Sequence, residues 1–396
     1  MHRLNTALGM PQHRFASVHV VGTNGKSSVT RMTAALLEAH GLATGAAVSP
    51  HARRWSERIL LRGAPIGSAE FAAATERVAA AVEVVERALE EGERMTQFEF
   101  ATAIAFVAFV SARLDAAVIE AGLGGRLDAT NTIPSRVTVL TSVGLDHTEW
   151  LGETVEEIAA EKLAVLRHGT TLVLGRVPDT VAALAATTAA ERGARLVQAA
   201  EDPGPEVELA RAPGAFQRRN FALASAAAEA FLGELDPARV ADVAAAVAVP
   251  GRLERIAEDP PTYVDAAHNP DGAGALAEAL ASVAPGPVVA VLAVLAGKDA
   301  EGIVAALAPA LDKVVVTELP EAVAGRGTDP SARPRHSRGA GELAAICRQT
   351  GLAAEEVPGF AAAAARAREL AAAMPGGTVL FTGSHYVLGP ARDAVS

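Results

Sequence analysis

The sequence predicts an α/β protein of two domains, each built around a parallel sheet. In the first half, short apolar runs alternate with segments of helical spacing, a pattern typical of parallel strands joined by helices. Near residues 250–251 the same cycle restarts. A length of 396 residues is comfortable for two domains and long for one. We therefore expect a first domain at residues 1–249 and a second, smaller one at 250–396.

Hydrophobic spacing and turn residues place the elements of the first domain. Residues 28–40 have apolar side chains at helical spacing, and Gly41 ends that helix. A capping box that runs from Thr154 to Glu157 opens another helix. Strands are expected at 18–21, 45–48, 116–121 and 137–143.

The second domain has a clear helix start at Asn269 and Pro270, because asparagine caps helices and proline suits their first turn. The Ala-rich run at 361–365 lies inside a helical pattern, so we expect it to be helical. Strands are expected at 263–266, 288–295, 314–317 and 379–382.

The composition limits the class of partner. A formal net charge of −11 argues against a nucleic-acid partner, which would need a basic face. The single cysteine, Cys347, excludes a disulfide framework within the chain and fits a reducing cytoplasm. No apolar run is long enough to cross a membrane, and the start of the sequence lacks the apolar stretch of a signal peptide. We expect a cytoplasmic, monomeric protein that acts on small molecules.

The strongest local signal is a Gly-rich segment that follows a strand and opens a helix. It consists of Gly22, Thr23, Asn24, Gly25, Lys26, Ser27 and Ser28. Glycines let the backbone N–H groups face phosphates, and the helix N-terminus adds partial positive charge. Lys26 would reach the terminal phosphates of a nucleotide, and the hydroxyl of Ser27 or Ser28 would meet Mg²⁺. The spacing is shorter than the usual phosphate-loop pattern, and a chance Gly-rich turn is the alternative.

Three polar residues lie at or just beyond the carboxyl ends of predicted strands. They are Ser49, Glu120 and His147. In open α/β sheets this edge is where ligands bind. A hydroxyl, a carboxylate and an imidazole beside a phosphate loop would suit a metal that bridges phosphate oxygens. Taken singly, each of these residues is more often structural, and only the arrangement of all three favours a functional role.

Lys162 lies on the apolar side of the helix that the capping box opens. It stands four residues after Ile158 and four before Leu166, so it points inward with them. A buried ammonium is costly unless it is paired or neutralised, and a side chain that reaches out to water is the alternative. Lysine is scarce, since only Lys26, Lys162, Lys298 and Lys313 occur among 35 Lys and Arg residues. The four lysines are therefore candidates for places where a guanidinium cannot substitute.

Seven blocks occur in the order in which they stand in folylpolyglutamate synthases, a family within the wider Mur ligase group. They are GTNGKSS at 22–28, SPH at 49–51 with Glu57 and Arg58, EAGLGGRLDATN at 120–131, LDHT at 145–148, Glu161 with Lys162, PGRLE at 250–254 and DAAHNP at 265–270. The chain resembles that family from about Leu4 to Gly389, and the third and fourth blocks are its most specific motifs.

The resemblance implies a P-loop-type domain like the central domain of Mur ligases, followed by a Rossmann-like C-terminal domain. Members of the family use ATP and Mg²⁺ to phosphorylate the carboxylate of a folate or of dihydropteroate. The amine of L-glutamate then attacks the acyl phosphate. Extension of a folate and addition of the first glutamate to dihydropteroate both remain open for this chain.

The resemblance also implies roles for single residues. Lys26 and its loop hold the triphosphate, and His268 falls near the reacting centre. Lys162 corresponds to a carbamylated lysine, which joins Ser49, Glu120 and His147 as a Mg²⁺ ligand. Nucleotide contacts fall on Asn220, Arg252 and Asp265. The pterin site falls on Thr96, Phe98, Asp128 and Ala129.

Three positions depart from the family pattern. Phe216 stands where a histidine is frequent, Ala266 replaces the usual glycine of its turn, and Ser27 stands where many members have glycine. None of these changes removes an expected ligand. Two alternatives stay open: a Mur-type ligase of peptidoglycan precursors, and a regulatory P-loop NTPase that makes no amide. The third block argues against the first, and the second domain with its own Asp-His turn argues against the second.

Overall fold

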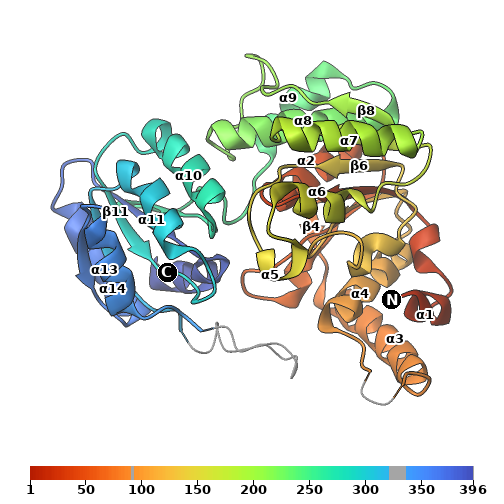
Figure 1. The fold of residues 1–396 in the computed structure, drawn as a ribbon, viewed down its shortest axis with the longest axis horizontal. Coiled ribbons are helices and arrows are strands. Elements are labelled where there is room, and N and C mark those ends of the chain that lie inside the picture. The colour runs from red at the N-terminus through yellow and green to blue at the C-terminus, as the bar shows by residue number, and fades with distance from the viewer. Residues whose placement is uncertain (91–92, 321–335, 396) are drawn as a thin grey trace. The chain divides into compact units, whose positions relative to one another are not determined.

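The computed structural model describes residues 1–90, 93–320 and 336–395, and it divides into two compact units. Unit 1 comprises Met1–Ala210 and Arg218–Val247. Unit 2 comprises Arg211–Gln217 and Ala248–Ser396. The last change of unit falls between Val247 and Ala248, and the segment 211–217 also belongs to unit 2. Figure 1 follows the chain through unit 1 from red to green and through unit 2 from green to blue.

Unit 1 is built on an eight-stranded sheet of order β4-β3-β2-β5-β1-β6-β7-β8. The strands are β1 Ala16–Val21, β2 Thr44–Ala47, β3 Ile59–Leu61, β4 Ala64–Pro65, β5 Ala116–Glu120, β6 Val137–Leu140, β7 Thr171–Leu174 and β8 Arg195–Gln198. From β2 to β8 all neighbours are parallel, as predicted. At the other edge β3 and β4 run antiparallel, which the sequence did not predict. A two-residue hairpin turn, Arg62 and Gly63, both with positive φ, joins these two strands.

Helices cover both faces of this sheet (Figure 1). They are α1 His2–Ala7, α2 Lys26–Ala39, α3 Ser68–Glu86, α4 Gln97–Ser111, α5 Thr148–Leu151, α6 Val155–Leu163, α7 Asp179–Glu191, α8 Ala215–Leu232 and α9 Pro237–Ala246, with short 3-10 turns η1 Pro11–His13, η2 Trp55–Arg58 and η3 Ala129–Thr132. The predicted capping box is present at α6, where the Thr154 hydroxyl accepts a hydrogen bond from the Glu157 N–H. Helix α2 begins at Lys26, two positions before the predicted start, so the lysine lies in its first turn.

Unit 2 is built on a six-stranded sheet of order β13-β12-β11-β14-β10-β9. Its elements are β9 Glu254–Glu258, β10 Pro261–Val264, α10 Pro270–Val283, β11 Val288–Leu292, α11 Ala300–Leu307, η4 Ala308–Ala310, β12 Lys313–Val316, α13 Ala340–Gln349, β13 Ala353–Glu356, α14 Phe360–Ala372, β14 Thr378–Thr382, η5 His385–Val387 and α15 Leu388–Val395. Only β9 is antiparallel to its neighbour. Asn269 caps α10 as predicted, since its side chain accepts from the Gly272 N–H at 2.8 Å. Two α/β units with mainly parallel sheets confirm the predicted fold class.

Each sheet has its own core, and each of its edge strands carries a proline or charged residues. In unit 2 one cluster of buried side chains joins β11, β12 and β14 to α10, α11 and α13. The edge strands hold Pro65 in β4, Arg195 in β8, Glu254 and Arg255 in β9, and Glu355 in β13.

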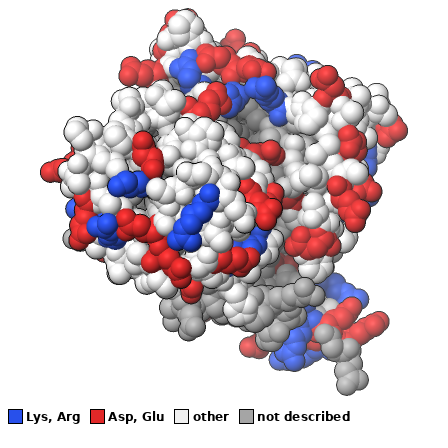
Figure 2. All heavy atoms as spheres, turned by 60° about the vertical axis from the view of Figure 1, so that its left-hand side comes forward, with Lys and Arg blue, Asp and Glu red and all other residues white. Residues whose placement is uncertain are grey.

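Figure 2 shows acidic side chains spread among basic ones over the face in view, without one basic patch. Within the described residues, no helix is long and apolar enough to span a membrane.

Candidate active site

The Gly-rich segment forms a tight turn between β1 and α2. Gly22 and Gly25 have φ of +150° and +83°. A Cβ at Gly22 would lie 1.9 Å from the Thr141 Oγ1, and one at Gly25 would lie 2.6 Å from the Asn220 Oδ1. The Lys26 ammonium donates to the carbonyl oxygens of Gly22 and Thr23, at 3.0 Å each. The backbone therefore curls around its own lysine, in the geometry expected of a phosphate loop.

The segment after β6 supports this turn, a role that was not predicted from the sequence. The Thr141 hydroxyl donates to the Asn24 carbonyl at 2.6 Å, and the Asn24 N–H donates to the Ser142 hydroxyl at 3.0 Å. The Thr23 hydroxyl donates to the Gly144 carbonyl at 3.2 Å. A polar run directly after a buried parallel strand was the available signal, because that edge of the sheet is where ligand loops gather.

Ser27, Ser49 and Glu120 come together beside the phosphate loop. The Ser27 hydroxyl lies 2.9 Å from both carboxylate oxygens of Glu120, and the Ser49 N–H donates to one of them at 2.9 Å. By contrast, Ser28 is buried, and among the residues that the structure describes its hydroxyl has no hydrogen-bonding partner. The serine that faces the carboxylate is thus Ser27, which the sequence left undecided.

These oxygens suit a hard divalent cation. Hydroxyl and carboxylate oxygens are the ligands that Mg²⁺ prefers, and the carboxylate of Glu120 is buried, so its charge needs compensation. His147 is half-exposed, with a φ of +53°, and its Nε2 lies 3.9 Å from the Asp146 carboxylate. Within the described ranges, no three His, Cys, Asp or Glu side chains gather as a metal site. A magnesium site here would depend on serine hydroxyls and on a modified lysine as well.

Lys162 points inward, as its position in α6 predicted. Its side chain is only 4% exposed, and its ammonium donates to the Gly22 carbonyl at 3.0 Å. Burial, and next the nearby Lys26, lower the pKa of Lys162 to about 7, while Asp146 and Asp128 oppose the shift. Near neutral pH a large fraction of its amine is therefore uncharged, which is the nucleophilic form.

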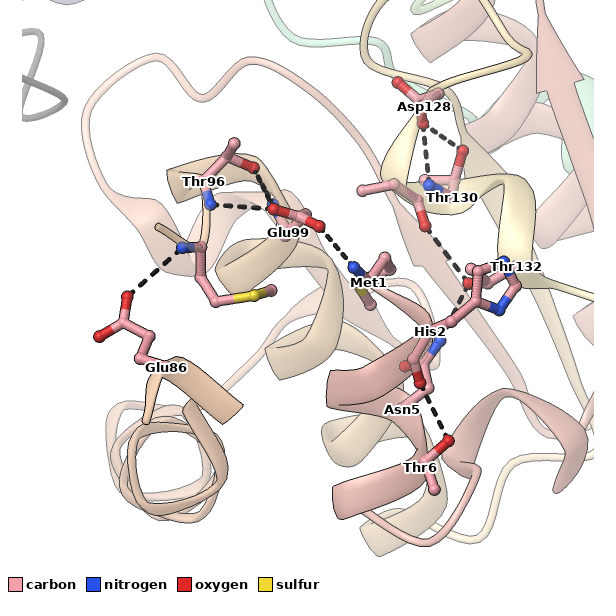
Figure 3. Close-up of polar contacts among 12 residues, drawn as sticks. Met1, His2, Asn5, Thr6, Glu86, Thr96, Glu99, Asp128, Thr130 and Thr132 are labelled. Carbon is pink, nitrogen blue, oxygen red and sulfur yellow. Dashed lines mark hydrogen bonds and ion pairs between the residues drawn. The ribbon is translucent and has the colours of Figure 1, made fainter. Parts of the chain in front are cut away.

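The candidate pterin residues lie on α4 and on the loop that follows β5. Thr96 caps α4 within a capping box, and Figure 3 shows Glu99 between Thr96 and the amine of Met1. The Phe98 ring packs on Gly122, where a Cβ would lie 2.5 Å from the ring. The partly buried Asp128 accepts hydrogen bonds from the N–H groups of Gly122 and Leu123, at 2.9 Å each.

The candidate residues of unit 2 surround the end of β10. Asp265 is buried and accepts from the Leu253 N–H at 2.8 Å and from the Ala267 N–H at 2.7 Å. Burial raises the pKa of Asp265, against the charge of the nearby Arg252. The His268 ring nitrogen Nδ1 lies 3.0 Å from the Ala266 carbonyl oxygen. The strand-to-helix turn predicted from the sequence is thus stabilised by hydrogen bonds from backbone N–H groups to the Asp265 carboxylate.

Comparison with family models finds matches over most of the chain. Residues 20–202 match the model of the Mur ligase middle domain, and residues 251–385 match that of the Mur ligase, glutamate ligase domain. The chain is 38% identical to the dihydrofolate synthase/folylpolyglutamate synthase of Mycobacterium tuberculosis over 348 residues, which is 78% of this chain and 72% of that protein. It is 35% identical to the folylpolyglutamate synthase of Lacticaseibacillus casei, over 79% of each chain.

Solved structures show the same similarity. The folylpolyglutamate synthase of Mycobacterium tuberculosis complexed with ADP superposes with a TM-score of 0.90 at 34% identity, covering 100% of this chain and 93% of that one. A bifunctional folylpolyglutamate synthase/dihydrofolate synthase with Mn, AMPPNP and L-glutamate bound superposes with a TM-score of 0.81 at 29% identity, covering 99% of this chain and 93% of that one.

Proposed function

The chain belongs to the dihydrofolate synthase/folylpolyglutamate synthase family of Mur ligases, which are ATP-dependent, and from this we propose how its residues divide the reaction. It is an ATP-dependent ligase that adds L-glutamate to a folate. We propose that dihydropteroate is a second acceptor, and that the enzyme works in the cytoplasm as a monomer. The relatives give no support to the peptidoglycan ligase or the regulatory NTPase.

One observation carries the proposed division of roles. Ser27 and Glu120 contact each other beside the same turn on which the ammonium groups of Lys26 and Lys162 both rest, at the Gly22 carbonyl. A phosphate chain and a divalent cation would both find partners beside this turn, because it carries both cations and oxygen ligands. The assignment of Ser49 and His147 to the metal rests on their place in the family motifs.

The first step transfers the terminal phosphoryl group of ATP to a carboxylate oxygen of the pterin substrate, with ADP as the leaving group. Such a transfer depends on positioning and on neutralising charge rather than on covalent catalysis by the protein. Lys26 and the N–H groups at the start of α2 would hold the phosphate oxygens. Magnesium, when bound, would supply further positive charge at those oxygens.

In the second step the neutral amine of L-glutamate attacks the acyl carbon. The new C–N bond replaces the C–O bond to phosphate, which leaves as inorganic phosphate, and the amine gives up a proton. We propose that Asn220, Arg252 and Asp265 contact the nucleotide, and that His268 lies near the reacting groups. Thr96, Phe98, Asp128 and Ala129 would hold the pterin.

We propose further that Lys162 is carbamylated in the active enzyme. Its uncharged amine would add to CO₂ with loss of one proton, which converts the buried neutral amine into a carboxylate-like anion. That anion would then be a ligand for the divalent cation, as the family motif implies. Arginine cannot form this group, which accounts for a lysine in a chain that otherwise favours arginine.

Product analysis tests the acceptor. Purified protein is incubated with ATP, Mg²⁺ and L-glutamate, with dihydropteroate or tetrahydrofolate offered in turn, and the products are identified by mass spectrometry. We expect one added glutamyl residue on each acceptor, with one ADP released per amide bond. The Lys26→Ala variant is the control and should form neither product. ADP release without any glutamylated product would contradict the proposal.

A further inference from the structure

His19 is a buried imidazole in a strand that is otherwise mostly apolar. None of its side chain is exposed, and β1, to which it belongs, runs directly into the phosphate loop. Its Nε2 lies 2.8 Å from the Thr130 hydroxyl. Burial, and next the charge of Arg167, lower the pKa of His19 to about 3, so the ring is neutral under ordinary conditions.

The hydrogen bonds of Thr130 fix the direction of this contact. The Thr130 hydroxyl donates its one proton to the Asp128 carboxylate, and the Thr130 N–H donates to the same oxygen at 2.9 Å, as Figure 3 shows. The Thr130 oxygen must therefore accept from His19, whose Nε2 carries the proton. The second Asp128 oxygen accepts from the N–H groups of Gly122 and Leu123. Burial raises the pKa of the Asp128 carboxyl, and the donors on both of its oxygens oppose that shift.

We propose that His19 is a positioning residue for the pterin site, which it fixes through Thr130 and Asp128. This inference rests on the proposed function. Asp128 holds the backbone at Gly122, and the Phe98 ring lies directly on that glycine. A shift of Asp128 would therefore move the surface on which Phe98 rests. Because His19 belongs to the strand that ends at the phosphate loop, the chain of hydrogen bonds sets the pterin site at a fixed distance from the phosphates.

Other side chains hold the same short helix without touching Asp128. The Arg167 guanidinium donates to the carbonyl oxygen of Asn131, and the Asn5 side-chain amide donates to the Thr132 hydroxyl at 3.0 Å. Thr132 is thus a matched control for Thr130. Both are threonines in η3, both have a side-chain hydrogen bond to another element, and only Thr130 reaches Asp128.

The test measures KM for dihydropteroate and for ATP in Thr130→Val and Thr132→Val. Valine keeps the shape of threonine and removes the hydroxyl. We expect Thr130→Val to raise KM for dihydropteroate about tenfold or more, a loss of about 1.4 kcal/mol of binding, while KM for ATP stays within about twofold. Thr132→Val should leave both constants within about twofold of the parent. Thr130→Ser keeps the hydroxyl and should restore the parental value.

Two variants of His19 test the donor itself. His19→Leu should raise KM for dihydropteroate as Thr130→Val does, and His19→Gln, whose amide N–H can still donate, should recover most of the loss. If His19→Leu does not fold, the two valine variants decide alone. The double variant His19→Leu/Thr130→Val should raise KM for dihydropteroate no more than the more damaging single variant does. Both changes break the same series of hydrogen bonds.

Equal effects of Thr130→Val and Thr132→Val, or additive losses in the double variant, would overturn the inference and leave His19 with a purely structural role. Those results would not touch the proposed function, because the parent would still glutamylate a pterin. A parent that glutamylates no pterin would overturn the proposed function and this inference with it.

Discussion

The ionisation of Lys162 can be measured directly because lysine is so rare in this chain. Only four lysines contribute to the ¹³Cε spectrum of protein labelled at lysine. In buffer free of CO₂ and Mg²⁺, we expect one signal to titrate near pH 7 and to be missing from Lys162→Met. Four signals that all titrate above pH 9 would contradict the burial argument.

The lowered pKa of Lys162 also makes the stability of the protein depend on pH. The pKa of Lys162 is lowered from 10.5 to about 7 by folding, so between these values the unfolded chain binds more protons than the folded one. The free energy of unfolding therefore rises with pH across this window, and the contribution is lost as the pH falls towards 7. Methionine cannot titrate, so in Lys162→Met the free energy of unfolding, measured by urea denaturation, should rise less between pH 7 and pH 10.

Glu120 gives a second prediction at the scale of a single residue. Glu120→Gln keeps the shape of the side chain and removes the charge that faces Ser27. We expect the Mg²⁺ concentration for half-maximal activity to rise at least about tenfold. Glu83→Gln, at an exposed position on α3, should leave it unchanged and serves as the control. An unaltered Mg²⁺ dependence in Glu120→Gln would return the carboxylate to a structural role.

The position of a single side chain was predictable where a local sequence pattern determined the direction in which it points. The helical spacing of α6 placed Lys162 inward, and the structure confirms this. The choice between Ser27 and Ser28 was not predictable, because it depends on the residue at which α2 begins. The contact of His19 with Thr130 joins positions 111 residues apart, and no local pattern carries that information.

At the scale of elements, the loop after β5 packs against the last turn of α6. A Cβ at Gly125 would lie 2.5 Å from the Glu161 carbonyl oxygen, and the Arg126 N–H donates to that same oxygen at 3.1 Å. Gly125 has no positive φ, so only this close approach requires glycine there. The loop and the helix that carries Lys162 are therefore in direct backbone contact.

We predict that Gly125→Ala lowers both stability and turnover. The added methyl group must push the end of α6 away, at a cost of about 1–3 kcal/mol, and Lys162 would move with that turn. Gly274→Ala is the control, because its Cβ in α10 would meet nothing within 4 Å and alanine favours a helix. Urea unfolding and kcat of the two variants check this. Unchanged kcat and stability in Gly125→Ala would contradict this prediction, because the loop would then accommodate the methyl group without displacing α6.

All inner strands except β3 and β7 were predicted from the sequence, and none of the edge strands was. Strands buried on both faces have continuous apolar runs, such as β5 and β11, and these were placed within a few residues. Strand β13 reads Ala353–Glu356 and has no apolar run, so only its pairing with β12 makes it a strand. The predicted strand at 137–143 ends at Leu140, because the polar residues beyond it turn to support the phosphate loop.

At the scale of the whole molecule, the two units have separate cores. The core of unit 2 consists of residues from within its own range, and the family model of the glutamate ligase domain matches 251–385 alone. We therefore expect a fragment of residues 248–396 to fold by itself, without the 211–217 segment, from which only Phe216 packs on this core. Circular dichroism should show one cooperative thermal transition, and the fragment should have no ligase activity because it lacks the phosphate loop. A fragment without a cooperative transition would mean that its sheet needs unit 1.

The edge strands affect whether copies of this enzyme associate through their sheets at high protein concentration. A strand with free N–H and C=O groups invites another molecule to lengthen the sheet, and prolines or charges on that strand prevent it. Pro65 cannot donate at one edge, and the Glu355 carboxylate at another is already paired with Arg366 at 2.7 Å. Collisions between copies should therefore be unproductive, and turnover per molecule should stay constant from nanomolar enzyme up to the concentration at which the protein is stored.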